Sequence, residues 1–549
     1  MDSPTEVLIA GAGPVGLTAA LDLTRRGIAV RIVDAAPGPA INSRAIATHP
    51  RTLETYAQLG VVDTVLRRGR RITGFALYRD GRRLARLAAD YTDMPTRFPF
   101  TMCIDQVVTE EILREALRAH GVEPEWGVRL ESLEQDDEQV TVSLRHGEQT
   151  RQCRVPWLIG CDGGHSTVRS MLDLPLIGAS RQTWLLADAQ VDTDLPPDSI
   201  YWIRAQRATM MAVPFIEPGR WRMLDTVDID YDGDPARLAA RLTRKLQIGL
   251  GQPTVVHPPS WVSVFTAQQR MVPRMRRGRC FVAGDAAHVH SPASGQGMNT
   301  GIQEAYNLAW KLAMVIRGHA DQSVLDTYSL ERVPVGQELL TSTEKATRFV
   351  QLSNPVADRL LPVVFTAVST ISALRRRMQG KMLGAVSGLN LEYSASPLTR
   401  PGADPVPGSG QVPRPGQRLT RRIAGPAESS AEQAFAAELQ DVRWTLLVAV
   451  PAEPGGELFE LLEAARTRYD AWLSVRAVGS GTGSEPAMPL PALLPDGDGA
   501  LRASLGLADG GWILVRPDGY VSARGQQLGR DVLDTLPANL WPHRTAERT

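Results

Sequence analysis

The sequence predicts a protein of several domains that combines α/β and α+β architecture. Three observations lead to this fold class. Residues 7–34 have the pattern of a strand, a helix and a second strand, and a strand-rich stretch with many large side chains runs from about Thr183 to Thr266. Beyond a linker rich in proline and glycine, Ser396–Gln417, strands again alternate with helical segments. The 549 residues allow three to four domains, since a domain usually has about 100–200 residues.

The composition excludes several classes of protein. Lys+Arg and Asp+Glu are both 60, and this balance argues against a nucleic-acid or anionic-membrane binder, because both need a basic excess. The four cysteines are too few and too scattered for a disulfide framework or a CxxC metal site, so we expect a reducing, cytoplasmic compartment. The N-terminus lacks a basic segment, and no stretch has the roughly 18 apolar residues of a spanning helix. We therefore expect neither a signal peptide nor a membrane anchor.

The first unit places glycines where a dinucleotide-binding turn of the Rossmann type requires them. Val7–Ala10 is a buried strand, GAGPVG follows it, a helix runs to Gly27, and Ala29–Asp34 is the second strand. In this pattern the first glycine makes a tight turn, the second lets the backbone approach a pyrophosphate, and the third allows close helix–strand packing. The acid at the end of the second strand accepts hydrogen bonds from ribose hydroxyls. The predicted cofactor-binding residues here are Gly11, Ala12, Gly13, Pro14, Val15, Gly16 and Asp34.

The remaining elements follow from the same periodicities. We expect helices over Arg51–Leu59, Asp105–Gly121, a long stretch from about Asn299, and Ser323–Leu383. Strands are expected around Val140–Leu144 and Arg154–Gly160, within Arg277–His288, and at Trp444–Val450, Trp472–Val478 and Trp512–Gly525.

A second glycine-rich segment follows the buried strand in Arg277–His288. Asp285 stands directly after this strand, at the edge where parallel sheets bind ligands, and its carboxylate can accept hydrogen bonds from hydroxyl groups. The loop Pro292–Gly297 then opens a helix whose first N–H groups can stabilise a negative charge. An ordinary helix cap explains the glycines but not the strand end before them. The predicted cofactor-binding residues in this segment are Asp285, Pro292, Gly295, Gly297, Met298 and Asn299.

Three motifs in this order resemble those of the FAD-dependent aromatic hydroxylases, the class A flavoprotein monooxygenases. They are GAGPVG (Gly11–Gly16), CDGGHSTVR (Cys161–Arg169) and GDAAHVHSPASGQGMNTGIQEAYNLAWKL (Gly284–Leu312). More narrowly, the chain is similar to the branch that tailors aromatic polyketides and carries a thioredoxin-like C-terminal domain. The resemblance implies a Rossmann-type FAD domain of the GR2-like glutathione-reductase family, a mostly antiparallel β-sheet substrate domain and a C-terminal thioredoxin-like α/β domain.

With this resemblance the chain divides into five parts. They are a discontinuous FAD-binding domain (1–70, 103–180 and 276–340), a β-sheet substrate domain (71–102 and 181–275), a helical connector (341–395), a linker (396–412) and a thioredoxin-like domain (413–549). All four cysteines precede the last domain, so it cannot perform dithiol chemistry. A structural or oligomerisation role remains for it, and a homodimer stays open.

The resemblance also assigns single residues. It implies that Asp285 holds the flavin ribityl chain and that Asp162 acts near the pyrophosphate, although Asp162 could also cap the helix that follows. Arg44 matches an arginine near the flavin, and Gln106 matches a glutamine at the ribityl or phosphate region. Leu130 matches a position whose backbone meets the adenine.

The implied activity is hydroxylation of a phenolic, polycyclic substrate of the polyketide type. The resemblance implies that FAD binds non-covalently, that NADPH or NADH visits transiently, and that reduced flavin combines with O2 to give a C4a-hydroperoxide, which transfers oxygen to the ring. No side chain is nominated as catalytic, because the cofactor supplies the chemistry. Two alternatives stay open. One is Baeyer–Villiger insertion or an oxidative rearrangement on a polyketide ketone, and the other is a flavin-binding protein that shelters a reactive biosynthetic intermediate.

The expected partner is a small aromatic molecule, held between the flavin and the strand-rich middle of the chain. Large apolar side chains are singly more often core than pocket wall, but their density here suggests a large apolar cavity. The pocket candidates are Phe98, Phe100, Trp184, Met210, Met211, Phe215, Trp221 and Met223. His288 and His290 form an HxH pair without a third ligand in a recognisable spacing, so no metal is expected.

Overall fold

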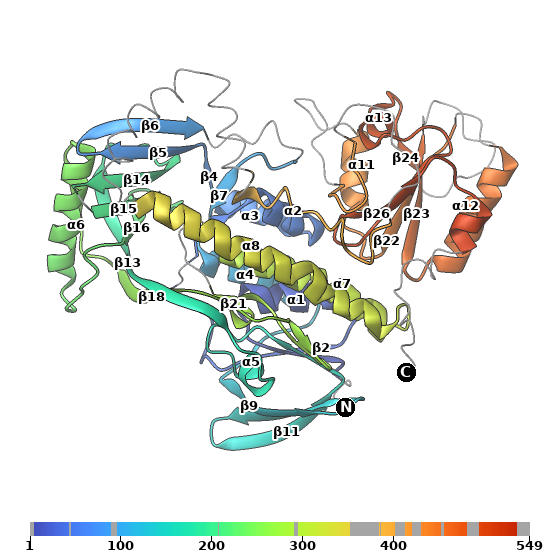
Figure 1. Ribbon diagram of the computed structural model, residues 1–549, viewed down its shortest axis with the longest axis horizontal. Coiled ribbons are helices and arrows are strands. Elements are labelled where there is room, and N and C mark those ends of the chain that lie inside the picture. The colour runs from blue at the N-terminus through green and yellow to red at the C-terminus, as the bar shows by residue number, and fades with distance from the viewer. Residues whose placement is uncertain are drawn as a thin grey trace.

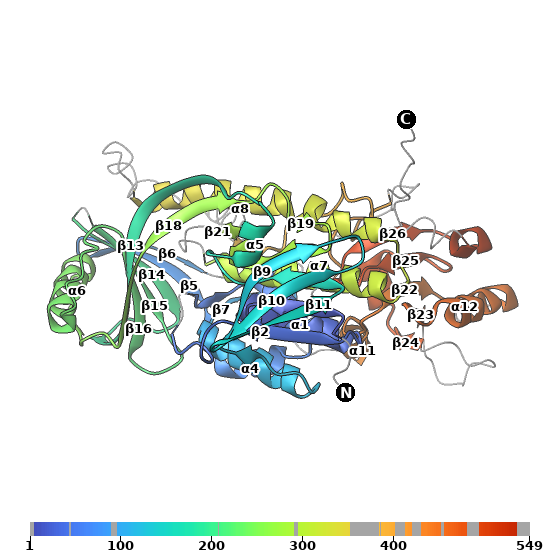
Figure 2. The same cartoon turned by 90° about the horizontal axis from the view of Figure 1, so that it is seen from below.

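The computed structural model describes residues 5–42, 45–88, 96–206, 208–289, 295–351, 384, 386–400, 412–419, 430–451, 455–479 and 493–534. Figure 1 shows an antiparallel sheet with α6 (Pro235–Leu250) at one end and a smaller α/β body at the other, with a parallel sheet and the long helices between them. Figure 2, seen from below, places α6 and the C-terminal sheet at opposite ends of the molecule. This combination of layers confirms the predicted mixture of α/β and α+β architecture.

The central sheet has six strands among the described residues, in the order β19-β20-β12-β1-β2-β8. Its core strands are almost wholly apolar and buried, as expected for a parallel sheet covered on both faces. The strands are β1 (Val7–Ala10), β2 (Val30–Asp34), β8 (Glu125–Trp126), β12 (Trp157–Gly160), β19 (Arg276–Arg277) and β20 (Cys280–Val282). The predicted strand Arg154–Gly160 is divided at Pro156, because proline has no N–H for the ladder.

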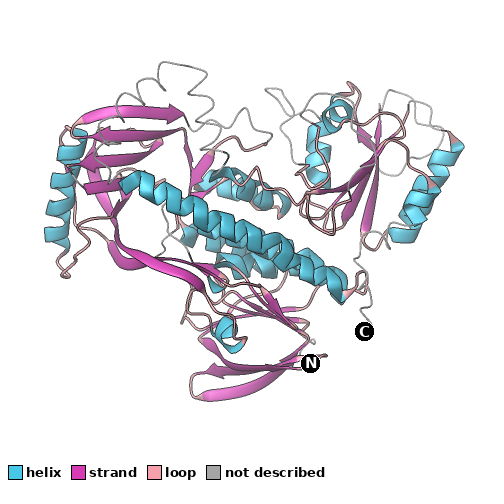
Figure 3. Ribbon diagram, in the orientation of Figure 1, coloured by secondary structure: helices cyan, strands magenta, loops and turns pink. Residues whose placement is uncertain are grey.

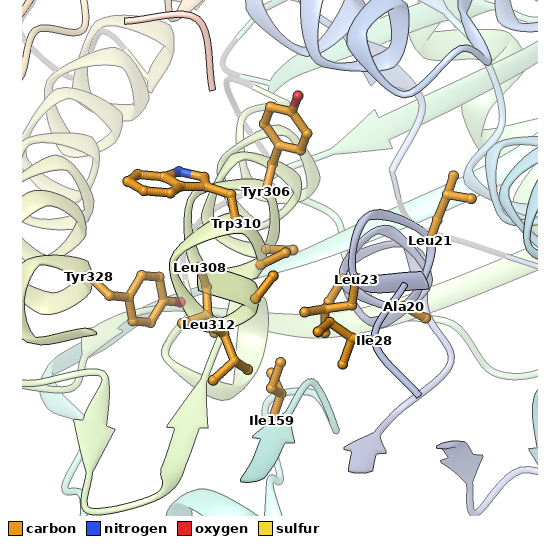
Figure 4. Packing of buried hydrophobic residues seen from close by; sticks show 14 of the residues in the cluster. Ala20, Leu21, Leu23, Ile28, Ile159, Tyr306, Leu308, Trp310, Leu312 and Tyr328 are labelled. Atoms are coloured by element: carbon orange, nitrogen blue, oxygen red, sulfur yellow. The ribbon is translucent and has the colours of Figure 1, made fainter. Parts of the chain in front are cut away.

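Helices α1 (Pro14–Arg25) and α7 (Gly297–Ile316) pack side by side against this sheet. In Figure 4, Leu23 of α1 and Leu308 and Leu312 of α7 gather above Ile159 of β12. The helices and short strands around them are α2 (Pro50–Gln58), α3 (Val62–Arg68), α4 (Gln106–Arg118), α5 (Thr167–Met171), α8 (Asp326–Gln351), η1 (Gly284–Ala286), η3 (Gln322–Leu325), the sheet β3-β7-β4 (Ala47–Thr48, Thr101–Cys103, Arg70–Ile72) and the sheet β11-β10-β9 (Gln149–Val155, Val140–His146, Val128–Gln135). The expected helix Ser323–Leu383 is described only as far as residue 351.

The strand-rich middle of the chain forms a largely antiparallel sheet of nine strands within the described ranges, covered on one face by α6. Helix α6 begins sharply because Asp234 caps it and Pro235 follows, and it ends at Gly251, whose φ of +69° suits a glycine. The strands are β5 (Gly74–Arg79), β6 (Arg82–Ala88), β13 (Ile177–Thr193), β14 (Ser199–Ala205), β15 (Ala208–Pro214), β16 (Arg220–Asp225), β17 (Thr254–Val256), β18 (Trp261–Met271) and β21 (His288–Val289).

The C-terminal body is a five-stranded sheet, in the order β24-β23-β22-β25-β26, with helices on its faces (Figure 3). Strands β22, β23 and β24 are parallel, while β25 runs antiparallel to both β22 and β26. The elements are α11 (Ser430–Glu438), β22 (Trp444–Ala449), α12 (Gly456–Tyr469), β23 (Leu473–Gly479), β24 (Leu493–Pro495), α13 (Ala500–Leu505), β25 (Trp512–Val515) and β26 (Val521–Gly525). In the part of the chain that the structure covers, no helix combines the length and apolar character that a membrane crossing requires.

Candidate functional site

Three parallel strands end side by side at one edge of the central sheet. The register places Ala10 of β1 beside Gly160 of β12, and Gly160 beside Val282 of β20. The chain leaves β1 towards β2 on one side, whereas β12 and β20 lie on the other side. The sheet therefore reverses its strand order between β1 and β12, and open α/β sheets bind their ligands at such a point. All three sequence motifs follow these strand ends.

The turn after β1 is built by its glycines. Gly11 has a φ of +106°, and a Cβ on Gly11 would lie 2.2 Å from the carbonyl oxygen of Cys161. A Cβ on Gly16 would lie 1.9 Å from the Gly11 carbonyl oxygen, so both positions exclude a side chain. A Cβ on Gly13, in contrast, would meet no atom of the described residues within 4 Å. Gly13 is the N-cap of α1, which has no side-chain cap, so the positive end of the helix faces this open space.

Asp34 joins the end of β2 to this turn. One carboxylate oxygen accepts the Ala12 N–H at 2.7 Å, and the other accepts the Ala36 N–H at 2.8 Å. An ionised carboxylate has about four acceptor positions, so two remain for the hydroxyls of a ribose.

Asp162, after β12, is engaged by the helix that follows it. Its carboxylate accepts the Thr167 and Val168 N–H groups at 2.7 and 3.2 Å, and the hydroxyl of Ser166 donates to it. Ser166 itself occupies the N-cap position of α5. The geometry thus favours the helix-capping interpretation of Asp162, with the residue still at the edge where β12 ends.

The loop after β20 is held by a buried carboxylate of α7. Glu304 accepts the Gly284 N–H at 2.9 Å and contacts Nε2 of His288 at 2.8 Å. Burial by itself raises the pKa of Glu304, but His288, Arg332 and the Gly284 amide outweigh it and hold that pKa below its ordinary value. Burial likewise lowers the pKa of His288, but Glu304 and then Asp285 more than reverse this and raise it. Asp285 is exposed directly beside this buried pair.

The start of α7 is tied to β3 and lies close to the start of α1. The Asn299 side chain accepts the His49 N–H at 2.9 Å and donates to the carbonyl oxygens of Ala47 and Gly295 at 2.8 and 2.7 Å. Asn299 therefore fixes the backbone instead of projecting towards a ligand. A Cβ on Gly301 would lie 2.6 Å from Cγ2 of Val15, which shows how closely the first turns of the two helices approach. Gly297 and the buried Met298 begin α7.

The other predicted cofactor residues lie around this edge or outside the described residues. Gln106 begins α4, where its side-chain amide donates to Glu110 at 2.8 Å and its backbone N–H donates to Ala45 at 3.2 Å. Leu130 is buried in β9, and the chain just before β9 reaches the end of β2 through the Gly127 N–H, which donates to Ala36. Arg44, Pro292 and His290 lie outside the described residues.

The predicted pocket residues divide between the two faces of the antiparallel sheet. Met210, Trp221 and Met223 pack beneath α6, so the structure places them in the core of that face. Trp184, Met211 and Phe215 lie on the opposite face, where Phe215 and Val213 pack against Ile46, Ile72 and Cys103 beside the sheet β3-β7-β4. Phe98 and Phe100 contact each other edge to face just before β7. The face that carries Trp184 is thus the one turned towards the candidate cofactor site.

The described residues include no cluster of three or more His, Cys, Asp or Glu side chains that could hold a metal ion.

The geometry of the strand edge is that of a dinucleotide site, and similarity to known proteins shows which dinucleotide the family binds. The family described as FAD binding domain matches residues 4–343. The chain belongs to this family.

Relatives of the family narrow the class of reaction. The chain is 47% identical to the 6-methylpretetramide 4-monooxygenase of Streptomyces rimosus, over 97% of this chain and 92% of that relative. Among solved structures it is similar to the anhydrotetracycline hydroxylase OxyS from Streptomyces rimosus, with 27% identity, a TM-score of 0.72 and coverage of 98% of this chain and 99% of that chain. A ternary complex of aklavinone-11 hydroxylase with FAD and aklavinone gives 25% identity and a TM-score of 0.73 over 98% of this chain and 99% of that chain. The protein is a monooxygenase of the FAD-dependent aromatic hydroxylase type, and the predicted family is confirmed.

Two buried pairs near the candidate site of this FAD-binding family member were not foreseen from the sequence. One is Glu304 with His288, described above. The other is Asp188 with Arg222, a bidentate pair with distances of 2.8 and 2.7 Å on the sheet face that carries Trp184. The sequence did hold a clue, which is the position of each charge. Glu304 stands inside an apolar helical run, and Asp188 lies on the same face of β13 as Trp184 and Leu186, because residues two apart share a face. A charge at a core position needs a buried partner.

Proposed function

We propose that the protein hydroxylates a phenolic ring of a polycyclic, polyketide-type substrate, with FAD as bound cofactor and NAD(P)H and O2 as co-substrates. The observation that carries this proposal is the 47% identity, over nearly the whole chain, to a relative named 6-methylpretetramide 4-monooxygenase. The aklavinone-11 hydroxylase complex, named for both FAD and a substrate, supports a site that holds the two together.

The residues at the strand edge fit FAD. The open space at Gly13, in front of the uncapped start of α1, suits the pyrophosphate, and Asp34 suits the adjacent ribose. Asp285, exposed after β20, suits the hydroxyls of the ribityl chain, and the N–H groups at the start of α7 suit the electronegative edge of the flavin ring. Bound FAD would supply hydride acceptance and the activation of O2. The protein would supply position, charge stabilisation and exclusion of water.

The face of the antiparallel sheet with Trp184 and Met211 is the proposed substrate wall. Beside the Asp188–Arg222 pair it also carries the partly exposed Arg220, whose guanidinium lies 3.8 Å from the Asp188 carboxylate and 4.1 Å from the ring centre of Phe215. The Arg222 guanidinium lies 5.3 Å from the ring centre of Phe215 and 5.2 Å from that of Trp261. An aromatic ligand would meet a largely apolar surface with cationic groups at Arg220 and Arg222, which suits a polycyclic phenol that carries oxygen acceptors.

We also propose the domain division given above, including a thioredoxin-like C-terminal domain. The strand order β23-β22-β25-β26, with a parallel strand–helix–strand unit followed by an antiparallel pair, supports that comparison.

The test is turnover by purified protein reconstituted with FAD. We expect a polycyclic phenol of the pretetramide type to accelerate NADPH or NADH oxidation and to gain one oxygen atom from 18O2 while remaining a phenol. Incorporation into a lactone ring would favour the Baeyer–Villiger alternative. FAD binding with no substrate-stimulated oxidation would favour the sheltering alternative, and absence of FAD binding would refute the proposal.

A further inference from the structure

One turn of the C-terminal body reaches deep into the FAD-binding part of the chain. It comprises Arg516–Tyr520, between β25 and β26, and we call it the docking turn. Arg516 donates to both carboxylate oxygens of Glu331 on α8, at 2.7 and 2.9 Å. Asp518 accepts Nε1 of Trp310 and the side-chain amide of Asn307, both on α7 and both at 3.2 Å. The docking turn therefore contacts the two long helices of the FAD-binding part.

The docking turn, α7 and α8 share four buried charges that balance one another. Lys311 and Arg516 are cationic, Glu331 and Asp518 are anionic, and no side chain of the four is more than 3% exposed. Lys311 donates to Glu331 at 2.8 Å, and Arg516 also pairs with Asp518 at 2.6 Å. Buried charges are tolerated only in a specific geometry, because any loss of a partner leaves an uncompensated charge. The docking turn thus holds α7 and α8 in one defined arrangement.

In Figure 4, Tyr306 and Trp310 rise from α7 on the side away from Ile159 of the central sheet. The Tyr306 hydroxyl donates to the carbonyl oxygen of Pro517 at 3.2 Å, so the docking turn contacts the outer side of the helix whose inner side covers the sheet. Arg51 of α2 also donates to the Asp518 carbonyl oxygen, at 2.8 Å. Three helices of the FAD-binding part therefore meet at one turn.

A line of contacts continues from the docking turn to the candidate cofactor site. Arg332, next to Glu331 on α8, donates to the Tyr393 hydroxyl at 2.9 Å and to the Thr300 carbonyl oxygen, in the first turn of α7, at 3.3 Å. The ring of Tyr393 lies 4.5 Å from that of Tyr520 in the docking turn. The Arg332 charge also acts on Glu304, the residue that holds the Gly284 loop.

We propose that the docking turn is a positioning element of the cofactor site. Docking fixes Arg332 through Glu331 and Tyr393, and Arg332 in turn holds the first turn of α7 through the Thr300 carbonyl oxygen. This inference rests on the proposed FAD site. It gives the C-terminal domain a role in flavin binding that acts through α7 and α8.

The test compares two buried aspartates of the C-terminal domain. Asp518→Asn keeps the volume and the acceptor for Trp310 but removes the charge that pairs with Arg516. The matched control is Asp496→Asn. Asp496 is equally buried, accepts the Leu501 and Arg502 N–H groups at 2.8 and 2.9 Å, and has these partners in its own domain. Tyr393→Phe is a milder second variant that removes only the hydroxyl bound by Arg332.

The measurements are the FAD dissociation constant and the visible circular dichroism of the bound flavin at saturating FAD. We expect Asp518→Asn and Tyr393→Phe to weaken FAD binding about 2- to 30-fold, the range found for residues that act through a coupled network, and to change the flavin spectrum. Asp496→Asn should leave both at the wild-type values. By linkage, FAD should slow amide hydrogen exchange in the docking turn of the wild-type protein.

The proposal is overturned if all three variants bind FAD with the wild-type dissociation constant and flavin spectrum. It is also overturned if the FAD affinity of all three variants falls in proportion to their loss of folding stability. If Asp518→Asn does not fold, Tyr393→Phe against Asp496→Asn decides. Failure of the wild-type protein to bind FAD would instead refute the proposed function, so the two failures are distinguishable.

Discussion

Gly13→Ala should separate cofactor binding from folding. Gly13 has a φ of −74° and a ψ of −178°, which alanine adopts without strain, and its Cβ would enter open space. The loss of chain entropy in the unfolded state favours alanine by about 0.4–1 kcal/mol, while alanine is a poorer N-cap by a similar amount. The apo protein should therefore keep its stability to within about 1 kcal/mol. The same methyl group would stand where a pyrophosphate must approach the backbone. Loss of one charge-assisted hydrogen bond, about 1.5–3 kcal/mol, would weaken FAD binding about 10- to 150-fold.

The assay pairs denaturant unfolding of the apo protein with an FAD titration followed by flavin fluorescence. Gly455→Ala is the matched control, because Gly455 is also the N-cap of a helix, has an extended backbone with φ −64° and ψ 151°, and has no atom within 4 Å of its Cβ position. It should leave FAD affinity unchanged. Wild-type FAD affinity in Gly13→Ala would refute the placement of the pyrophosphate at this turn, and a large loss of apo stability would refute the argument from open space.

The remaining predictions concern buried groups. Glu304→Gln should lower stability by about 1.5–3 kcal/mol. Because the pKa of Glu304 is lowered and that of His288 is raised in the fold, this loss should be greatest between about pH 4.3 and 6.5 and shrink as the pH rises through the raised imidazole pKa; unfolding curves across pH check it, and a pH-independent loss would contradict it. Asp188→Asn should lower the free energy of unfolding by about 3–5 kcal/mol, because it leaves a buried guanidinium without its charge partner. A decrease of less than about 1 kcal/mol in urea unfolding would show that the pair behaves like a solvent-exposed salt bridge. Met210→Ala should cost about 2–5 kcal/mol of stability and leave the substrate KM unchanged, whereas Met211→Ala, its neighbour on the other face, should change KM. Equal effects of the two on KM would contradict the assignment of the faces.

Local sequence patterns were sufficient to predict the secondary-structure elements around the first strand. The apolar run Val7–Ala10, the glycines after it and the acid at residue 34 each have a short-range cause, so they predicted β1, α1 and β2 with nearly the observed bounds. The same holds for α4, which was expected over Asp105–Gly121 and observed over Gln106–Arg118. Asp105 caps this helix through the Val107 N–H, which is a local signal.

The division of the pocket residues between two faces could not be predicted. Strand β15 reads ATMMAVP, and its residues are buried or half-buried on both sides of the sheet. Without polar residues at alternate positions, the period of two that assigns a face is absent. The pairing of Arg516 with Glu331 was hidden for another reason, because the partners are 185 residues apart in the sequence. Only the tertiary fold brings such charges together.

The central sheet also sets the order in which the protein can fold during synthesis. Val7 pairs with Trp157, and Leu158 pairs with Cys280, so the sheet draws its neighbours from widely separated parts of the chain. During synthesis, which proceeds at about 5–20 residues per second, β1 and its glycine turn leave the ribosome well before β20 and α7 exist. Pairings between distant segments also form slowly, because the loop must close before the contacts form. The nascent chain therefore spends this interval with an exposed edge on β12, and we expect chaperone dependence to concentrate there.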